Sequence, residues 1–245
     1  MRLFGLIGFP LTHSFSKQFF DNKFRSEGLS DCAFTNFPLK NIEEIKQVMA
    51  DHPNLEGFAV TIPYKKKIIR FLDEGTEPVR QMVACNCVKI VEGKLKGYNT
   101  DVTGFEISFR KKLQPHHTKA LILGTGGAAE SIAFVLRKMG IEYLFVSRNK
   151  ELKAKTISYK ALNASLMQDH TLLINCTPVG MYPKVDEYPG VPYQHLSSKH
   201  YLYDLVYNPA KTKFLEKGEE QGAITCNGYE MLTIQAEENW KIWND

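Results

Sequence analysis

Cysteine is scarce in this sequence, with five residues in a chain of 245. Their number is odd, no Cys-x-x-Cys pair occurs, and no histidine cluster stands at zinc-ligand spacing. These absences argue against a disulfide-stapled secreted domain and against a zinc site. We therefore expect reduced thiols, a cytoplasmic location and no bound metal.

Long apolar runs are also absent, since no stretch approaches the roughly 18 residues of a membrane span. The apolar start from Leu3 to Phe9 meets Pro10 with no small-residue cleavage site after it, which favours a buried strand over a signal peptide. With 43% hydrophobic residues, the chain has enough apolar material for a core. We expect a soluble globular protein that does not bind membranes.

Strong charge of one sign is missing as well. The formal net charge is +4, and the densest basic run is the three lysines at 65–67. Such a run is usually a solvated surface, and a nucleic-acid site needs a larger basic patch and a matching fold. We expect no nucleic-acid partner, although a mildly positive surface suits anionic small molecules.

Short apolar runs alternate with helical patterns along the chain, which predicts an α/β fold with mainly parallel sheets. A connector near residue 115, after which the rhythm restarts, favours two such sheets. The predicted strands cover residues 3–9, 32–37, 57–62, 87–91, 94–98, 120–123, 143–146, 172–175 and 201–205. The predicted helices cover residues 16–27, 41–50, 64–72, 101–113, 126–139, 210–221 and 231–243.

The most specific local signal is the glycine-rich segment 124–129, GTGGAA, between a predicted strand and a predicted helix. It fits the G-x-G-x-x-A pattern of a dinucleotide-binding turn. Gly124 permits the tight turn, Gly126 lets the backbone approach the pyrophosphate, and Ala129 lets the helix pack closely on the strand. The ordinary alternative is a glycine-rich turn without a ligand, but both flanking elements favour the dinucleotide.

The next strand indicates which dinucleotide is bound. NAD-binding proteins usually carry an acidic residue at its tip, which holds the ribose 2′-hydroxyl. Here the tip reads Ser147, Arg148, Asn149. Arginine pairs well with a 2′-phosphate, so we expect NADP(H), although a surface arginine is a common alternative.

Polar side chains follow the predicted strands of the first half. In open parallel sheets, ligands bind outside the carboxyl ends of the strands. Singly, each side chain has an ordinary reading: a serine or aspartate as a helix cap, a threonine in a strand, a lysine in a solvated run. Together they favour a site where Lys65 stabilises and protonates the oxygen that a hydride transfer leaves negative. The side chains in question are those of Ser14, Ser16, Thr61, Lys65, Asn86 and Asp101.

Taken in order, these segments resemble the conserved blocks of the shikimate dehydrogenase family over nearly the whole chain. FPLTHSFS at 9–16 resembles that family's Asn-Pro-x-x-His-Ser-x-Ser block, and VTIPYK at 60–65 its Val-Thr-x-Pro-x-Lys block. The other similar blocks are CNC at 85–87, GYNTD at 97–101, GTGGA at 124–128, YDLVYNP at 203–209, and GYEML at 228–232 with Gln235.

The resemblance implies an NADP-dependent, reversible reduction of 3-dehydroshikimate to shikimate, a step of chorismate and aromatic amino acid biosynthesis. It implies Lys65 and Asp101 as the catalytic pair. The implied substrate-binding residues are Ser14, Ser16 and Tyr207 for the carboxylate, and Thr61, Asn86, Asp101 and Gln235 for the ring hydroxyls. The implied cofactor-binding residues are Gly124, Thr125, Gly126, Gly127 and Ala128 for the pyrophosphate, Ser147, Arg148 and Asn149 for the 2′-phosphate, and Leu205 and Gly228 for the nicotinamide.

The resemblance also implies two α/β domains with a cleft between them. Residues 1–101 with 226–245 would form the substrate-binding domain, and residues 102–225 the Rossmann-like NADP-binding domain. We expect a monomer or a homodimer. The C-terminal helix would return to the first domain.

Several departures from the family pattern leave alternatives open. Phe9 stands where the family has Asn, Lys17 where Pro is typical, and Cys85 and Cys87 flank Asn86. The alternatives are a quinate/shikimate dehydrogenase, a related enzyme acting on another hydroxy acid, and a non-catalytic NADP-binding sensor. The presence of both Lys65 and Asp101 argues against the sensor, which needs no proton carrier.

Overall fold

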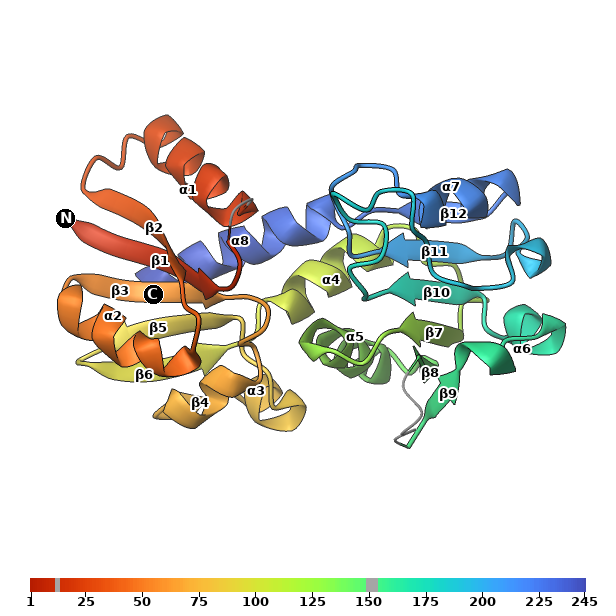
Figure 1. The fold of residues 1–245 in the computed structure, drawn as a ribbon, viewed down its shortest axis with the longest axis horizontal. Coiled ribbons are helices and arrows are strands. Elements are labelled where there is room, and N and C mark those ends of the chain that lie inside the picture. The colour runs from red at the N-terminus through yellow and green to blue at the C-terminus, as the bar shows by residue number, and fades with distance from the viewer. Residues whose placement is uncertain (12–13, 149–153) are drawn as a thin grey trace. The chain divides into compact units, whose positions relative to one another are not determined.

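The protein divides into two compact units in the structure, a computed structural model that describes residues 1–11, 14–148 and 154–245. The first unit comprises residues 1–100 and 235–245, and the second comprises residues 101–234. Both are α/β units built on a six-stranded sheet (Figure 1). Asp101 and residues 226–234, which were predicted to belong to the first domain, fall in the second unit. The reason is that Cys226 pairs with Tyr203 and Met231 packs into the core of that unit.

The sheet of the first unit is parallel at its centre and antiparallel toward one edge. Its strands are β1 (Arg2–Gly8), β2 (Cys32–Pro38), β3 (Leu55–Val60), β4 (Glu74–Gly75), β5 (Cys87–Val91) and β6 (Lys94–Tyr98). They lie in the order β2-β1-β3-β5-β6-β4. Strand β1 is parallel to both neighbours, whereas β5 is antiparallel to both β3 and β6. Consequently the end of β3 and the start of β5 share one edge.

Helices cover both faces of this sheet. One face packs against α1 (Phe15–Ser26) and the later turns of α8 (Tyr229–Asn244). The other face packs against a 3-10 helix (Ile42–Glu44), α2 (Ile45–Asp51), a second 3-10 helix (Lys67–Phe71) and α3 (Glu77–Met82). Side chains from both layers therefore bury each central strand.

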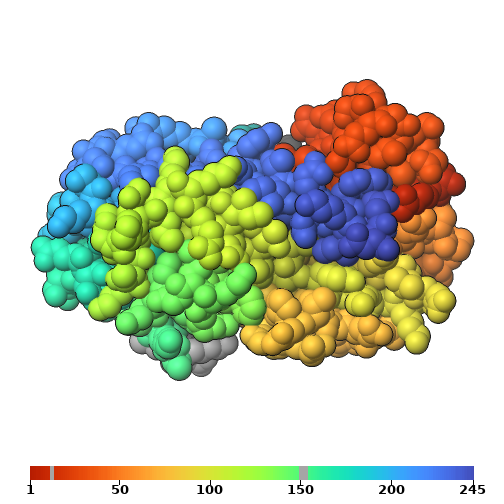
Figure 2. All heavy atoms as spheres, turned by 180° about the vertical axis from the view of Figure 1, so that it is seen from behind, coloured from red at the N-terminus to blue at the C-terminus, as the bar shows by residue number. Residues whose placement is uncertain are grey.

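Helix α8 is held on the first sheet by its last turns. The Trp243 ring stacks on Phe4 with centroids 5.1 Å apart, and its Nε1–H donates to the carbonyl of Val88 at 3.0 Å. Arg2 donates to the side chain of Asn244 at 2.9 Å. The last residues of the chain accordingly lie on the surface beside the first ones (dark blue and red in Figure 2).

The second sheet is parallel throughout. Its strands are β7 (Lys119–Leu123), β8 (Glu142–Ser147), β9 (Thr156–Ser158), β10 (Leu172–Asn175), β11 (Tyr201–Asp204) and β12 (Ile224–Cys226), in the order β12-β11-β10-β7-β8-β9. Counted along the unit, this is the 3-2-1-4-5-6 order of Rossmann folds. In folds of this kind the ligand binds where the strand order reverses, which here is between β7 and β10.

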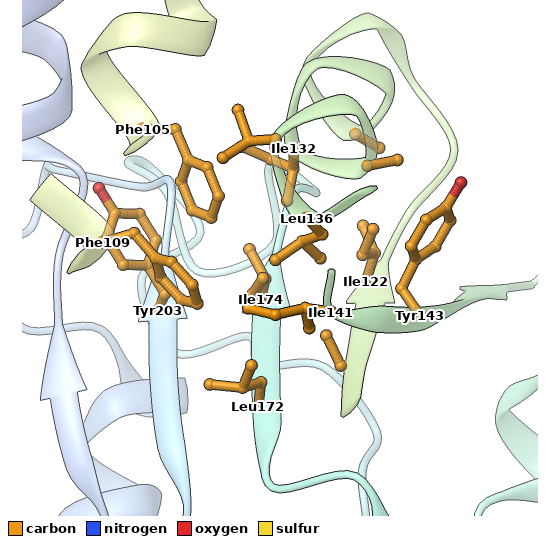
Figure 3. Close-up of a cluster of buried hydrophobic side chains, with 14 of the residues drawn as sticks. Phe105, Phe109, Ile122, Ile132, Leu136, Ile141, Tyr143, Leu172, Ile174 and Tyr203 are labelled. Atoms are coloured by element: carbon orange, nitrogen blue, oxygen red, sulfur yellow. The ribbon is translucent and has the colours of Figure 1, made fainter. Parts of the chain in front are cut away.

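The strands of the second sheet alternate between two cores. Ala120 and Ile122 face a core that contains helices α4 (Asp101–Arg110) and α5 (Gly127–Lys138), and Figure 3 shows this core around Phe105, Ile122 and Ile174. Leu121 and Leu123 face the opposite core with α6 (Ala164–Asp169) and α7 (Lys213–Glu220). The near-continuous apolar runs of these strands reflect burial on both faces.

The predicted α/β class, with a mainly parallel first sheet and a Rossmann-like second sheet, is confirmed. The strands predicted at 87–91 and 94–98 are observed with those bounds and form a hairpin. The helix predicted at 41–50 is observed as the 3-10 helix Ile42–Glu44 followed by α2, and Asn41 N–H donates to Glu44 Oε1 at 3.1 Å. The predicted helix at 64–72 is wrong in type, because only a 3-10 helix over Lys67–Phe71 follows the turn at Pro63. Five short elements, all of six residues or fewer, were not predicted: β4, β9, β12, α3 and α6.

Within the described residues, no helix is long and apolar enough to cross a membrane, and no group of three or more His, Cys, Asp or Glu side chains is arranged to hold a metal. The five cysteines are free thiols.

Candidate active site

The first unit gathers several predicted substrate residues at one edge of its sheet. The chain segments that follow β1 and β3 are joined by hydrogen bonds from Thr61 N–H to the carbonyl of Ile7 (2.9 Å) and from Phe9 N–H to that of Ile62 (3.1 Å). Val60 N–H donates to the carbonyl of Asn86 at 2.8 Å, which brings the start of β5 to the same edge. Parallel strand ends and the antiparallel β5 thus converge as the topology requires.

Ser14 and Ser16 stand at the amino end of helix α1. Ser14 occupies the cap position but makes no side-chain capping bond. Its Oγ is buried and has no hydrogen-bond partner in the part of the chain that the structure describes. Buried hydroxyls normally find a partner, so this one is suited to a ligand oxygen. The helix amino end adds a partial positive charge that favours an anion.

Lys65 lies in the turn that follows the Thr61 segment and is half-buried. Its carbonyl accepts a hydrogen bond from Cys85 N–H at 2.8 Å, next to Asn86. The neighbouring Lys66 and Lys67 are exposed, as expected of a solvated basic run. Lys65 is thus the one member of the run that is withdrawn from solvent, which suits a chemical role better than a solubilising one.

A buried polar network joins Asn86 to helix α8. Asn86 Nδ2 donates to Thr100 Oγ1 (3.0 Å) and to Gln235 Oε1 (3.4 Å), and Thr100 N–H donates to Asn86 Oδ1 at 2.7 Å. Thr100 Oγ1 in turn donates to Asn239 Oδ1 at 2.7 Å. Two predicted substrate residues, Asn86 and Gln235, are therefore brought together. Thr100 and Asn239, which the sequence analysis did not predict as site residues, hold them in place.

The second unit carries the glycine loop between β7 and α5. Gly124 has a φ of +106°, which favours glycine, and a Cβ at this position would lie 3.0 Å from Thr177 Cγ2. Gly126 caps helix α5, and a Cβ on it would meet no described atom within 4 Å. Ala129 is fully buried in the core beneath. The tight turn, the open approach and the close helix packing match a pyrophosphate cradle.

The tip of β8 carries Ser147, half-buried, and Arg148, exposed. Asn149 lies outside the residues that the structure describes. Ser147 pairs with Ser158 on β9, so Arg148 and Tyr159 both follow the ends of adjacent strands. Burial raises the pKa of Tyr159, and the positive charge of Arg148 opposes that rise. Tyr159 is therefore an additional candidate at the 2′-phosphate end, absent from the sequence prediction because no motif includes it.

Leu205, Tyr207 and Gly228 follow strands β11 and β12. Gly228 N–H donates to the carbonyl of Val206 at 3.2 Å, which joins the two segments. Tyr207 is half-buried, and burial raises the pKa of its hydroxyl. Asp101 is the first residue of helix α4 and is 4% exposed. The structure thus places Leu205 beside Gly228 and puts Asp101 at a helix amino end, where a carboxylate is favoured.

Comparison with known proteins identifies relatives that cover both units of the chain. Residues 6–88 match the model of the shikimate dehydrogenase substrate binding domain. A shikimate dehydrogenase (NADP(+)) from Caldicellulosiruptor saccharolyticus is 35% identical, in an alignment that covers 100% of this chain and 93% of the relative. The chain belongs to the shikimate dehydrogenase family.

Solved structures of shikimate dehydrogenases have the same fold. The enzyme from Aquifex aeolicus superposes with a TM-score of 0.88 at 31% identity, covering 100% of this chain and 92% of that one. The Thermus thermophilus enzyme, solved in complex with NADP(H) and shikimate, has a TM-score of 0.86 at 27% identity, covering 99% and 93%. The recognition made from the ordered sequence blocks is confirmed.

Proposed function

We propose that this protein is a shikimate dehydrogenase that reversibly reduces 3-dehydroshikimate to shikimate with NADPH, in the pathway to chorismate and the aromatic amino acids. The observation that carries the proposal is the glycine loop at the switch point of a 3-2-1-4-5-6 parallel sheet, in a chain whose full length aligns with this family. The open approach at Gly126 and the arginine at the tip of β8 fit NADP(H).

Each predicted residue has a chemical task in this proposal. Bound NADPH supplies a hydride to the carbonyl carbon of the substrate. Lys65 stabilises the negative charge on the carbonyl oxygen and gives it a proton, and Asp101 is the second catalytic residue. Ser14, Ser16 and Tyr207 hold the carboxylate, and Thr61, Asn86, Asp101 and Gln235 bind the ring hydroxyls. The network of Asn86 keeps its amide oriented for that task.

The proposed cofactor residues fall into three groups, each binding a different part of the dinucleotide. The loop Gly124, Thr125, Gly126, Gly127 and Ala128 holds the pyrophosphate at the amino end of α5. Ser147, Arg148 and Asn149 hold the 2′-phosphate, and Leu205 and Gly228 contact the nicotinamide. Because no carboxylate stands at positions 147–149, the tip of β8 favours the 2′-phosphate of NADP(H) over the free hydroxyl of NAD(H).

The direct test is oxidation of shikimate by the purified protein with NADP, followed by the absorbance of NADPH. Quinate and NAD serve as parallel alternatives. Activity confined to shikimate and NADP is the expected result. A preference for quinate or for NAD would assign the protein to the quinate/shikimate branch. Absence of turnover with every pair, in a protein that still binds NADPH, would overturn the assigned substrate.

We also propose a cytoplasmic enzyme that is a monomer or a homodimer. The five free thiols support the cytoplasmic location, because exposure to an oxidising compartment favours disulfides. Sedimentation of the purified protein and fractionation of the source cells test the two statements.

A further inference from the structure

A buried carboxylate, Asp204, lies at the end of β11 in the second unit. Its side chain is completely inaccessible to solvent. Three neutral donors converge on it: Asn175 Nδ2 at 2.9 Å and Val206 N–H at 3.0 Å on Oδ1, and Thr212 Oγ1 at 2.6 Å on Oδ2. Burial raises its pKa to about 6, and these donors oppose the rise. A carboxylate held in this way needs a reason, because burying charge is costly.

The donors come from three different segments, so the carboxylate joins them. Thr212 caps helix α7, with Leu215 N–H donating to its Oγ1 at 3.4 Å. Val206 belongs to the segment 205–207, which follows β11 and also contains Leu205 and Tyr207. Asn175 ends the neighbouring strand β10, and its carbonyl accepts from Leu205 N–H at 3.0 Å. The N–H groups of Leu205 and Val206 are thereby both engaged.

The segment 205–207 is fixed from both sides. Asp204 and Asn175 hold the N–H groups of Val206 and Leu205, while the carbonyl of Val206 accepts from Gly228 N–H at 3.2 Å. Leu205 and Gly228 are the residues proposed above for the nicotinamide. A shift of this segment would therefore displace one end of the cofactor and leave the tip of β8 unaffected.

Asn175 reaches in the other direction. Its Oδ1 accepts from Thr177 N–H at 3.1 Å and from Thr177 Oγ1 at 2.6 Å. Thr177 is the residue whose methyl group lies beneath Gly124. Asn175 thus connects the support of the glycine loop with the support of the segment after β11. Asp204 contacts that segment directly through Val206 N–H, and reaches the loop support only through the side chain of Asn175.

We infer that Asp204 is a positioning residue for the nicotinamide end of the cofactor, acting through the backbone of Leu205 and Val206. This inference rests on the proposed NADP-dependent function. The role requires one side chain that forms hydrogen bonds with all three groups, Asn175 Nδ2, Val206 N–H and the Thr212 hydroxyl, at a position closed to solvent, which an alanine cannot do.

Three variants separate this role from general stability. Asp204→Ala removes the acceptors and leaves three buried donors unpaired. Asp204→Asn keeps the shape: its carboxamide oxygen still accepts from Asn175 and Val206, and its NH2 can donate to Thr212, whose hydroxyl rotates. Asp169→Ala is the matched control. It removes a carboxylate from the last residue of α6, which precedes the amino end of β10, whereas Asp204 lies at the carboxyl end of the parallel strand β11.

Two probes report on the two ends of the cofactor site. Adenosine 2′,5′-bisphosphate carries the 2′-phosphate without a nicotinamide, and NADPH carries both. For Asp204→Ala we expect bisphosphate affinity within about threefold of wild type, NADPH affinity reduced about tenfold, and kcat reduced about 100-fold, the size of loss that misplacement produces. Asp204→Asn should recover most of kcat, and Asp169→Ala should match wild type in all three.

Other outcomes are equally informative. Equal losses of both probes in Asp204→Ala, or wild-type kcat and NADPH affinity, would overturn the positioning role. If Asp204→Ala does not fold, Thr212→Val removes a single donor, and it must lower kcat while sparing the bisphosphate for the inference to stand. Wild-type protein that binds neither probe would instead refute the proposed function, and the inference with it.

Discussion

The carbonyl oxygen of Leu205 occupies the space that a side chain on residue 228 would need. A Cβ built on Gly228 would lie 2.2 Å from that oxygen and 2.6 Å from the Leu205 carbonyl carbon, both backbone atoms. Neither can move aside as the end of a flexible side chain could. The two segments after β11 and β12 therefore fit together only with glycine at position 228.

We accordingly expect Gly228→Ala to lower kcat/KM for NADPH about tenfold to 100-fold, because it must displace Leu205 from the proposed nicotinamide contact. Steady-state kinetics with NADPH varied at saturating substrate measures the effect. Gly190→Ala is the matched control, since a Cβ there meets no described atom within 4 Å. Unchanged kinetics in Gly228→Ala would remove Leu205 and Gly228 from the cofactor site.

Lys65→Ala should reduce kcat by about 10²- to 10⁴-fold, the range expected when a general acid is removed. NADPH affinity, measured by fluorescence titration, should stay close to that of wild type, because Lys65 belongs to the substrate unit. The exposed Lys67 provides the control variant, Lys67→Ala, which should be fully active. Turnover like that of wild type in Lys65→Ala would exclude Lys65 as the proton carrier.

Arg148→Ala should weaken NADPH use and spare NADH use. Loss of a charge-assisted contact to the 2′-phosphate is expected to cost about tenfold to 100-fold in kcat/KM for NADPH. The readout is the ratio of kcat/KM for the two cofactors. Arg110→Ala removes an exposed arginine paired with Glu106 on α4 and should leave that ratio unchanged. A parallel fall for both cofactors would argue against a 2′-phosphate contact.

Trp243→Ala should destabilise the first unit by about 3–5 kcal/mol, as expected for a buried aromatic truncated to alanine. The ring is 3% exposed, stacks on Phe4 and donates to Val88. Urea unfolding followed by circular dichroism measures the change, with each unit allowed its own transition. Tyr229→Ala, at a side chain that is 55% exposed, should be nearly neutral. Equal effects of the two would show that α8 is not held by Trp243.

Stability should fall below about pH 6.5 because His117 is buried in its neutral form. Its Nδ1 accepts from Gln114 N–H at 2.9 Å, and its Nε2 donates to the carbonyl of Lys199 at 3.0 Å. Burial lowers the pKa of His117 below the unfolded value of about 6.5. Just below pH 6.5 the unfolded chain therefore binds more protons than the folded protein. The free energy of unfolding accordingly rises with pH through this range, and the contribution of His117 is fully present above it.

The check is the difference in urea midpoint between wild type and His117→Gln from pH 5 to pH 8. That difference should shrink as the pH falls, because protonation of the unfolded chain then offsets what the buried, neutral His117 contributes. Asp204 acts with the opposite sign between about pH 4 and pH 6, because its pKa is raised to about 6 in the folded state. Since Asp204 is present in both proteins, its contribution cancels. A pH-independent difference for His117→Gln would refute the assignment.

Local patterns predicted the elements that have strong local causes. The hairpin at 87–98 was predicted residue for residue because its turn at Glu92 and Gly93 interrupts two alternating strands. The short strands β9 and β12 were not, since three residues carry no measurable period and tertiary pairing alone defines them. The segment 64–72 has helical periodicity, but only five of its residues form a 3-10 helix after the turn.

The candidate site likewise has parts that local motifs predict and parts that only the tertiary structure reveals. Ordered motifs located the glycine loop, and the structure adds why Gly124 is required there, through the contact with Thr177. No local pattern pairs Asn86 with Gln235, because 149 positions separate them. The family resemblance assigned both to the ring hydroxyls, and the structure adds the hydrogen bond between them, which helix α8 makes possible. One sequence feature points to Asp204, namely that a charged residue ends an apolar strand. The residue was considered only as part of the family block at 203–209 and was assigned no role. The individual site assignments stay predictions until the variants are measured.

The first unit is built from two separate stretches of sequence, with the second unit between them, and this determines when each unit can finish folding during synthesis. Domains that are continuous finish in the order in which they leave the ribosome, the N-terminal one first. Here Gln235 and Trp243 belong to the unit that begins at Met1, while residues 101–234 form the other without interruption. The unit that is translated first therefore lacks its part of helix α8 until the whole of the second unit has been synthesised, so it reaches its final packing only after that.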